Sequence, residues 1–434
     1  MNTDVIIIGA GAAGLAAART LAEKSLRVII LEARDRVGGR VLSRQTSDGT
    51  AIELGAEFIH GRADDTMVVL REAGIKTIEP ADEAWKCTNG APQLDEEDFL
   101  NAAKIFEATQ SLTEDESVAR FLQRYLDDPS MHEDAALARL FVEGFDAADP
   151  QIASAKGIGD EWRSGADFTS TRPDGGYAPM FAYLLKRCTD AGVDLRLSTT
   201  ARIVKWHRGN VAVDVSNDRG ESDTLNAAAA VVTVPVGVLR NHQITFEPPL
   251  PPAKQDALQK IEMGHAVRVV LAFRTAFWQE IRGGRYRGAA FFRCQHEPFQ
   301  AFWTQLPVRD TTIVAWAGGP KAIALNALSR DERVESALQS VGQLLNDPVV
   351  TRREFAISWT HDWSGDAHSR GAYSYVSVGG ENARAALADP LDQTIFIAGE
   401  ATATDGQGGT VSGALKTGAR AAREVAATLC VKTT

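Results

Sequence analysis

Runs of consecutive apolar residues predict buried strands near both ends of the chain. Residues 5–8 and 28–31 form two such runs, and we expect the stretch 11–24 between them to be a helix. Residues 395–398 form another apolar run, and a long helix is expected to follow it from about Thr410. A strand that is apolar at every position is typical of a parallel sheet covered on both faces. The pattern therefore predicts an α/β fold.

The middle of the chain has different periodicities. Residues 192–216 alternate like an antiparallel ribbon, and residues 227–240 contain another buried strand before a turn. The pattern in 81–172 is helical and acidic, whereas in 256–370 aromatic strands alternate with a helix at 331–345. No internal repeat or low-complexity linker separates these segments. We therefore expect two interleaved domains instead of two in tandem.

One predicted strand carries a charge where an apolar residue is expected. The stretch "GHAVRVVLAF", residues 264–273, suits a packed sheet except for Arg268 in its middle. Either this guanidinium faces the surface, or it lies at the chemical centre of the protein. The strand pattern alone leaves both possibilities open.

Composition and charge narrow the class of protein. The chain has 434 residues, 44% of them hydrophobic, which is enough for two cores, and its net charge of -11 argues against nucleic acid or an anionic membrane as a partner. Its four cysteines have no metal-like or redox-like spacing, so we expect reduced thiols and no metal site. No signal peptide and no apolar run of about 20 residues is apparent. We expect a soluble, cytoplasmic protein.

A glycine-rich loop follows the first apolar run. In "GAGAAG", Gly9 permits a tight turn, Gly11 lets a pyrophosphate approach the backbone, and Gly14 lets helix and strand pack closely. The helix directs its N-terminal amides at the phosphates, and Glu32 ends the second strand where a carboxylate accepts hydrogen bonds from ribose hydroxyls. A glycine motif alone is weak, but the strand, helix, second strand and acid at this spacing predict a dinucleotide site.

The extension "RDRVGGR" makes the motif more specific. Gly38 and Gly39 permit a second close approach of the backbone, and Arg40 can reach a phosphate or the flavin edge; a solvated basic loop is the alternative. With this extension the sequence resembles the flavin amine oxidase superfamily, which includes monoamine oxidase, polyamine oxidase and the lysine-specific histone demethylase. The stretch "ELGAEFIHG", residues 53–61, is similar to the family's flavin-adjacent loop. The resemblance is to a soluble, bacterial type of member.

The resemblance implies the fold and its division into domains. It implies a Rossmann-like FAD-binding domain interleaved with a mixed α+β substrate-binding domain, as in the amine oxidase and glutathione reductase-like FAD folds. The FAD-binding domain is expected to comprise residues 1–80, 173–255 and 371–434. The substrate-binding domain is expected to comprise residues 81–172 and 256–370.

The resemblance also implies how FAD is held. Glu400 carries over to the ribityl-phosphate side of FAD, the start of the C-terminal helix faces the flavin N1 and C2 carbonyl, and the backbone near Ala201 touches the adenine. The positive end of that helix stabilises negative charge on the flavin. The expected cofactor-binding residues are Gly9, Gly11, Ala13, Gly14, Glu32, Ala33, Arg34, Gly38, Gly39, Arg40, Gly55, Ala56, Glu57, Phe58, Ala201, Trp363, Gly399, Glu400, Gly409, Thr410 and Val411.

An aromatic substrate site over the flavin is implied by "GAYSYV". Trp363 followed by Ala372 and Tyr373 is similar to the family's Trp…Gly-x-Tyr spacing, and Tyr373 carries over as one wall of a cage that orients the amine. The opposite wall falls on Thr410, the residue type of the demethylase. Monoamine oxidases attach FAD through a cysteine at the position that corresponds to Ala372 of this sequence. Alanine there implies noncovalent FAD. A core Trp and Tyr would be the alternative interpretation.

Further charged or titratable residues match positions of the family's site, but the sequence does not decide their roles. His60 matches a position where polyamine oxidases have histidine or glutamate, and it either binds the amine, shuttles a proton or is structural. Arg268 falls on the lysine that holds a water against flavin N5 and favours reaction with oxygen. Because a guanidinium is planar and does not deprotonate, Arg268 either holds that water or pairs with a substrate carboxylate. We interpret the acidic residues Glu143, Asp146 and Asp149 as a solvated loop, with an entrance to the site as the alternative.

Together these features predict an FAD-dependent amine oxidase with Arg268, Tyr373, Trp363, Thr410 and His60 in its catalytic site. Hydride passes from the carbon next to the amine nitrogen to flavin N5, O2 is the expected acceptor and gives H2O2, and the imine hydrolyses. An FAD-dependent C–C dehydrogenase or desaturase and a flavin-binding protein with little turnover are the alternatives. The expected partners are a small-molecule amine and O2, with no nucleic acid and no membrane. A monomer and a homodimer both remain open.

Overall fold

A five-stranded parallel sheet joins strands from the beginning, the middle and the end of the chain. The computed structural model describes residues 3–46, 49–87, 92–95, 103–164, 170–294 and 297–430. The order of the strands in this sheet is β10 (Asp194–Arg196), β2 (Val28–Leu31), β1 (Val5–Ile8), β14 (Ala229–Val232) and β23 (Ile395–Ile397). Neighbouring strands are parallel throughout. Every residue of β1, β2 and β14 is buried, which confirms the strands predicted from their apolar runs.

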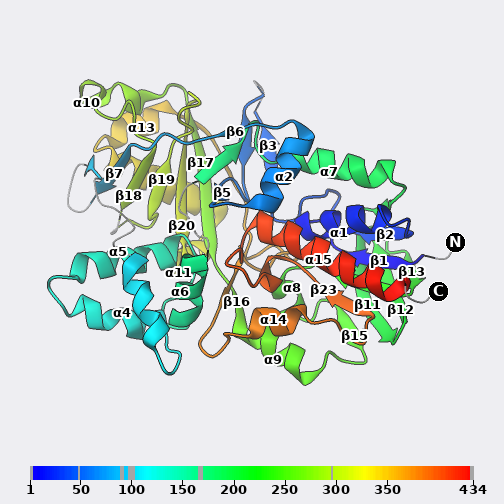
Figure 1. The fold of residues 1–434 in the computed structure, drawn as a ribbon. Helices are drawn as coiled ribbons and strands as arrows, with labels where there is room; N and C mark the ends of the chain where they lie inside the picture. Colours follow the sequence, from blue (N-terminus) through cyan, green and yellow to red (C-terminus); the bar gives the residue numbers. More distant parts are fainter. Residues whose placement is uncertain are drawn as a thin grey trace.

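The two faces of this sheet carry different layers (Figure 1). Ile7 and Ile30 point to one face, where they pack in a core with helices α1 (Ala12–Ala22), α2 (Asp64–Ala73), α7 (Ala178–Asp190) and α15 (Val411–Cys430). Ile6 and Ile29 point to the other face, which is covered by a second sheet and three helices. That layer contains β13 (Ser222–Ala227), β12 (Asn210–Asn217), β11 (Thr199–His207), β15 (Thr245–Glu247), α8 (Val236–Arg240), α9 (Pro252–Lys260) and α14 (Ala383–Ala388).

The ribbon predicted over residues 192–216 is only partly right. Strands β11 and β12 are antiparallel, as expected. The first part, β10, instead pairs in parallel with β2 at the edge of the five-stranded sheet. Alternation of apolar residues does not distinguish the two pairings, because a strand at the edge of a parallel sheet is also half exposed.

A seven-stranded sheet forms the other half of the molecule (Figure 1). Its order is β21 (Phe355–Thr360), β17 (Ala266–Phe273), β20 (Thr312–Gly318), β19 (Ala301–Trp303), β18 (Phe291–Cys294), β7 (Ala84–Cys87) and β8 (Gln93–Leu94). All its pairs are antiparallel except β7 with β18. One face packs in a core with η2 (Phe277–Gln279), α10 (Ile281–Gly284), α11 (Gly319–Asn326), α12 (Arg330–Leu344) and α13 (Pro348–Glu354). The helix predicted at 331–345 is confirmed as α12.

A helical lobe adjoins this sheet and has a core of its own. It comprises η1 (Ile105–Ser111), α4 (Val118–Leu126), α5 (His132–Gly144) and α6 (Ala155–Ser164). The helical interpretation of residues 81–172 is right for this lobe. It is wrong for β7 and β8, whose short sequences join the edge of the seven-stranded sheet.

Short pairings connect these layers. They are β3 (Ser43–Gln45) with β4 (Ala51–Glu53), β9 (Ser170–Pro173) with β5 (Ile59–His60) and β6 (Thr77–Ile78), and β16 (Ile261–Met263) with β22 (Ser374–Val376); η3 (Glu400–Thr402) precedes α15. In the part of the chain that the structure describes, no helix is long and apolar enough to cross a membrane. The predicted α/β fold is confirmed, while the domain boundaries stay a prediction.

Candidate active site

A cavity of about 950 Å³ lies between the parallel sheet and the seven-stranded sheet. Its walls include the carboxyl ends of β1 and β2, the start of α15 and the inner faces of β17, β18 and β20. The carboxyl ends of parallel strands are where α/β folds bind dinucleotides. Of the cofactor-binding and catalytic residues predicted from the sequence, all but Gly14 line this cavity.

The glycines of the first loop differ in the space around them. A Cβ atom on Gly14 would lie 1.9 Å from the carbonyl oxygen of Gly9, so this position packs helix α1 against the loop. A Cβ on Gly11 would meet nothing closer than the Cα of Gly39, at 4.0 Å. Gly11 and Gly39 therefore border open space at the N-terminal end of α1, where a pyrophosphate can approach the backbone.

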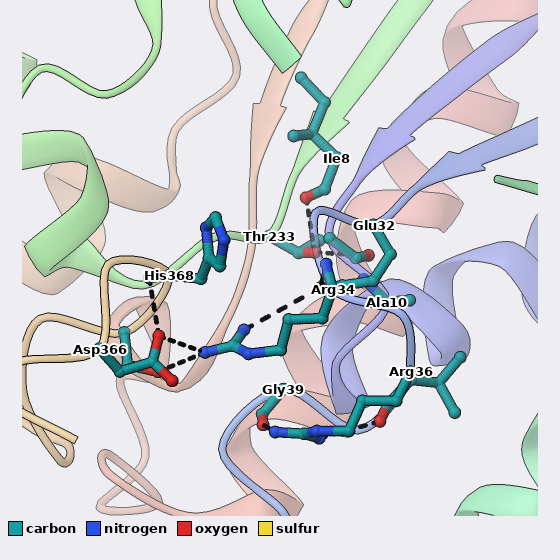
Figure 2. A network of polar contacts seen from close by, with 12 residues as sticks. Ile8, Ala10, Glu32, Arg34, Arg36, Gly39, Thr233, Asp366 and His368 are labelled. Atoms are coloured by element: carbon teal, nitrogen blue, oxygen red, sulfur yellow. Dashed lines mark hydrogen bonds and ion pairs between the residues drawn. The ribbon is translucent and has the colours of Figure 1, made fainter. Parts of the chain in front are cut away.

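The acid at the end of β2 is held in place by backbone amides. Glu32 is buried, its Oε2 accepts from the amide of Ala10 at 2.8 Å, and its Oε1 accepts from the amide of Arg34 at 3.0 Å. Arg34 in turn donates to Asp366 Oδ1 at 2.8 Å (Figure 2). Burial raises the pKa of Asp366, but hydrogen bonds from His361 and Arg34 outweigh it, so the net pKa is below the ordinary value. An ionised Asp366 thus ties a distant loop to the cofactor groove.

A second ion pair joins the loop after β2 to η3, the short helix that precedes α15. Arg40 Nη1 donates to Glu400 Oε1 at 2.8 Å and to the carbonyl of Ala372 at 2.9 Å. Glu400 Oε2 accepts from the hydroxyl of Ser374 at 2.6 Å and the amide of Gly409 at 2.9 Å. Burial raises the pKa of Glu400, but Arg40 and other donors bring it below the ordinary value. Arg40 is therefore a bound cation, not part of a solvated loop.

Thr410 lines the cavity, but its hydroxyl is occupied by the helix. Its Oγ1 accepts from the amide of Gly413 at 2.9 Å and donates to the carbonyl of Gln407 at 2.9 Å. This is the geometry of an N-cap, with the helix beginning at Val411 as expected. The cap fixes the positive end of α15 at the cavity wall. Together with Gly11, Glu32 and Arg40, this end fits a flavin dinucleotide.

Arg268 is buried and faces the cavity. Along β17 the odd positions Val267 and Val269 pack in the core, which turns Arg268 to the opposite face of the sheet. Its Nη1 donates to the carbonyls of Glu53 at 2.9 Å and Gly55 at 2.8 Å. The interpretation of Arg268 as a surface residue is therefore wrong.

Glu57 is the counter-ion of Arg268. The distance from Arg268 Nη2 to Glu57 Oε2 is 3.1 Å. Glu57 Oε1 also accepts from Arg172 Nη1 and Gln305 Nε2, each at 3.2 Å, and the indole of Trp303 donates to both oxygens at 3.2 Å. The carboxylate is thus bound by protein donors, and Glu57 contributes to the cavity wall with its polar end turned toward this network.

Two tryptophan rings enclose the guanidinium of Arg268. Its Cζ lies 5.2 Å from the ring centre of Trp303 and 5.6 Å from that of Trp316. Cation–π contacts of this kind favour the charged group in a site shielded from water. Neither tryptophan was singled out in the sequence, because the pattern of aromatic strands does not say which face of a strand meets the cavity.

Tyr373 and Trp363 both line the cavity. The ring of Tyr373 packs against Gly409, whose Cβ position is 3.3 Å from Tyr373 Cδ2, and its hydroxyl donates to the carbonyl of Phe145 at 2.5 Å. Trp363 is buried and donates to the carbonyl of Leu54 at 2.8 Å. Burial, chiefly, raises the pKa of Tyr373, so the phenol stays neutral. Tyr373 faces the cavity, whereas Trp363 supports its wall.

His60 belongs to an aromatic wall. Its ring meets that of Phe145 edge-on with centres 4.8 Å apart, and its Nδ1 is buried with no hydrogen-bond partner within the described ranges. Burial lowers the pKa of His60 to about 4, so the ring is neutral at neutral pH. Ring contacts extend this wall from His60 through Phe58 to Phe291, Trp303 and Trp316, and Phe141 lines the same cavity.

The acidic loop after α5 is not the solvated loop that its composition suggests. The part of Asp146 that remains accessible lines the cavity, and its Oδ2 accepts from the indole of Trp162 at 3.0 Å. Glu143 pairs with Arg139 at 2.9 Å along helix α5. The prediction is therefore wrong for Asp146, because Trp162 and the cavity wall remove its carboxyl from bulk water.

Comparison with known proteins decides the family. Residues 12–426 match the model of the family described as flavin containing amine oxidoreductase. The chain belongs to this family. It is therefore a flavin-containing oxidoreductase, as the sequence predicts. Polyamine oxidase 3 of Oryza sativa subsp. japonica is 28% identical to this oxidoreductase over 97% of the chain and 88% of the relative.

Solved structures confirm the fold of this oxidoreductase. A structure of putrescine oxidase bound to putrescine superposes with a TM-score of 0.82, at 24% identity over 98% of this chain and 99% of the other. Cyclohexylamine oxidase from Brevibacterium oxydans IH-35A gives 0.81, at 22% identity over 99% of this chain and 100% of the other. At these identities the likeness concerns the fold.

Proposed function

We propose that this oxidoreductase binds FAD noncovalently and oxidises a small amine. The observation that carries the proposal is that one cavity combines the glycine loop and Glu32 with an aromatic wall. Tyr373 contacts both Gly409 and Phe145 within it. The groove offers Gly11 and Glu32, and the far end offers rings such as Phe58 and Trp303. A groove of this kind suits FAD, and an aromatic end suits the body of an amine.

The cofactor is held by groups that belong to three parts of the chain. Gly11 and Gly39 leave room for the pyrophosphate, and Glu32 is positioned for the adenosine ribose. The capped start of α15 presents its positive end to the flavin. Ala372 has no thiol, so no covalent attachment can form there. FAD supplies the chemistry, since it takes up a hydride and passes the electrons on, with O2 as the expected acceptor and H2O2 as the product.

The protein itself positions the amine and excludes water from the site. Tyr373 and the aromatic wall would hold the amine in one orientation against the bound cofactor. Loss of hydride leaves an imine, which hydrolyses to a carbonyl compound and ammonia or a smaller amine. Arg268 keeps a fixed positive charge near this end, where it stabilises negative charge that develops on oxygen.

Anaerobic mixing with a panel of amines tests this function. The purified protein is expected to be yellow and to release intact FAD on acid precipitation, and at least one amine is expected to bleach the flavin. Air should then restore the yellow colour and yield H2O2. Flavin that stays attached to the denatured chain contradicts noncovalent binding. Bleaching by a substrate with a saturated C–C bond, and by no amine, favours the dehydrogenase alternative.

A further inference from the structure

Asp146 is a carboxyl group at the substrate end of the cavity that the proposed chemistry leaves without a task. It follows helix α5, and its accessible part lies within the cavity wall together with Tyr373 and Thr410. Its side chain is half-buried, and the rings of Phe145 and Tyr373 line the same cavity. A carboxyl in such surroundings costs free energy unless it has a partner.

One hydrogen bond holds this carboxyl, and a second one joins the adjoining backbone to Tyr373. The indole of Trp162, on helix α6, donates to Asp146 Oδ2 at 3.0 Å. The hydroxyl of Tyr373 donates to the carbonyl of the preceding residue, Phe145, at 2.5 Å. Asp146 is therefore fixed next to the ring that is proposed to orient the substrate.

The charged groups around Asp146 are committed elsewhere. Within the described part of the chain, no lysine, arginine or histidine forms an ion pair with it. Its neighbour Glu161 accepts from Arg384 Nε at 3.1 Å and Nη2 at 2.8 Å. Arg268, which also lines the cavity, is paired with Glu57 through an Nη2–Oε2 distance of 3.1 Å. The missing counter-charge can therefore come from a ligand.

An amine substrate brings such a charge. Aliphatic amines are cationic at neutral pH, because ordinary alkylammonium groups have a pKa near about 10. Hydride can leave the neighbouring carbon only when the nitrogen is neutral and its electron pair is available. The site must therefore admit an ammonium ion and then remove one of its protons.

We propose that Asp146 binds the ammonium group of the incoming substrate and accepts its proton. An N–H bond of the ammonium breaks, an O–H bond forms on the Asp146 carboxylate, and the electron pair stays on the nitrogen. No oxidant is involved in this step. The proton returns to solvent before the next substrate binds. The inference rests on the proposed amine oxidase function and adds to it the residue that receives the charged amine.

Other groups at this end are poorer acceptors. Burial first, and then Glu161, raises the pKa of Asp146 well above its ordinary value, so this carboxylate takes up a proton more readily than an ordinary aspartate. Burial lowers the pKa of His60 to about 4, so it holds a proton weakly. Tyr373 is neutral and uses its proton on Phe145. In a site of low dielectric constant, a neutral amine beside a protonated acid is also favoured over a buried ion pair.

Binding of an inert amine tests the inference without turnover. tert-Butylamine has no hydrogen on the carbon next to nitrogen, so it can bind but cannot be oxidised, and tert-butanol is its neutral analogue. Their affinities are measured from the perturbation of the flavin absorption. The variant is Asp146→Asn, and the matched control is Asp149→Asn, which lies in the same loop and whose Oδ1 only accepts from the amide of Gln151 at 2.9 Å.

At about pH 7.5, Asp146→Asn is expected to bind tert-butylamine about tenfold or more weakly than the wild type and Asp149→Asn. At about pH 10 the difference should shrink, because much of the amine is then neutral. Binding of tert-butanol should be alike in all three proteins. Equal amine affinities of Asp146→Asn and wild type at both pH values would overturn the proposal. If Asp146→Asn loses tert-butanol as well, Asp146→Glu decides: restored amine binding supports the role, and its failure overturns it.

A pH profile separates this inference from the proposed function. In anaerobic stopped flow with a reactive amine, the rate of flavin reduction should increase with pH. This increase should occur at a higher pH in Asp146→Asn than in the wild type. If the wild type is bleached by amines but the variant has the same profile, only the role of Asp146 fails. If no amine binds to or bleaches the wild type, the proposed function itself fails.

Discussion

The guanidinium of Arg268 and the carboxylate of Glu57 form a buried ion pair, with Nη2 and Oε2 3.1 Å apart and only 6% and 5% of the side chains exposed. The same guanidinium holds the carbonyls of Glu53 and Gly55, so it fastens the loop before β5 to strand β17. Arg268 is thus a fixed cation whose buried Nε–H has no hydrogen-bond partner within the described residues.

Breaking this pair should destabilise the protein. Arg268→Met removes the ion-pair partner of Glu57 Oε2 and the hydrogen bonds to the carbonyls of Glu53 and Gly55, and loss of one partner of a buried pair costs about 3–5 kcal/mol of the free energy of unfolding. The double variant Arg268→Met/Glu57→Gln should lose less than the sum of the single variants, because the two residues interact directly. Denaturant unfolding of the four proteins measures both effects. Additive losses would contradict a direct ion pair.

Substitutions of Arg268 also test its role in reoxidation of the flavin. Arg268→Lys keeps the charge and frees space for a water, so reduced flavin should react with O2 faster than in the wild type, whereas Arg268→Met should react more slowly. Reduction by a simple amine should change less. If both variants reoxidise like the wild type and lose substrate binding, Arg268 is instead an anchor for a substrate carboxylate.

Alanine substitutions at two glycines of the first loop should have different effects, one on stability and the other on FAD affinity. Gly14→Ala places a Cβ 1.9 Å from the carbonyl of Gly9, so the apoprotein should lose about 1–3 kcal/mol of stability. Gly11→Ala meets nothing closer than 4.0 Å, so the apoprotein should keep its stability while the methyl group obstructs the pyrophosphate and FAD affinity falls. Thermal unfolding of apoprotein and FAD titration measure the two effects. Equal behaviour of the variants would refute this division of tasks.

His60 should make stability depend on pH in acid. Burial lowers its pKa to about 4, below the value of about 6.5 in the unfolded chain, so its neutral form stabilises the folded protein. This contribution, up to roughly 3 kcal/mol, is complete above about pH 6.5 and is lost as the pH falls to about 4. His60→Phe should lack this part of the slope in unfolding experiments. Parallel curves for variant and wild type would show that His60 is accessible to water.

The cofactor groove could be predicted from the sequence because each of its motifs is local. Gly9, Gly11, Gly14 and Glu32 stand on consecutive elements, and their spacing determines their geometry once β1, α1 and β2 form. The start of α15 is predictable for the same reason.

The substrate end could be predicted only in part, because its polar groups are paired across distant segments. Glu57 meets Arg172 and Arg268, and no periodicity in three separate strands or loops indicates that they converge. Asp146 stands in an acidic stretch that is typical of a solvated loop. It is withdrawn from water only because Trp162 donates to it and the cavity wall covers it.

The most direct test of the account is anaerobic stopped-flow reduction of the flavin by an amine in the wild type, in Tyr373→Ala and in a control, Tyr183→Phe. The control changes a half-buried tyrosine of helix α7 whose hydroxyl donates to Glu72. We predict that an amine bleaches the wild type and the control alike. Tyr373→Ala should retain its FAD but be reduced roughly tenfold more slowly, because the ring orients the amine and does not hold the cofactor. An unchanged rate in Tyr373→Ala, or a wild type that dithionite bleaches and no amine does, would contradict the account.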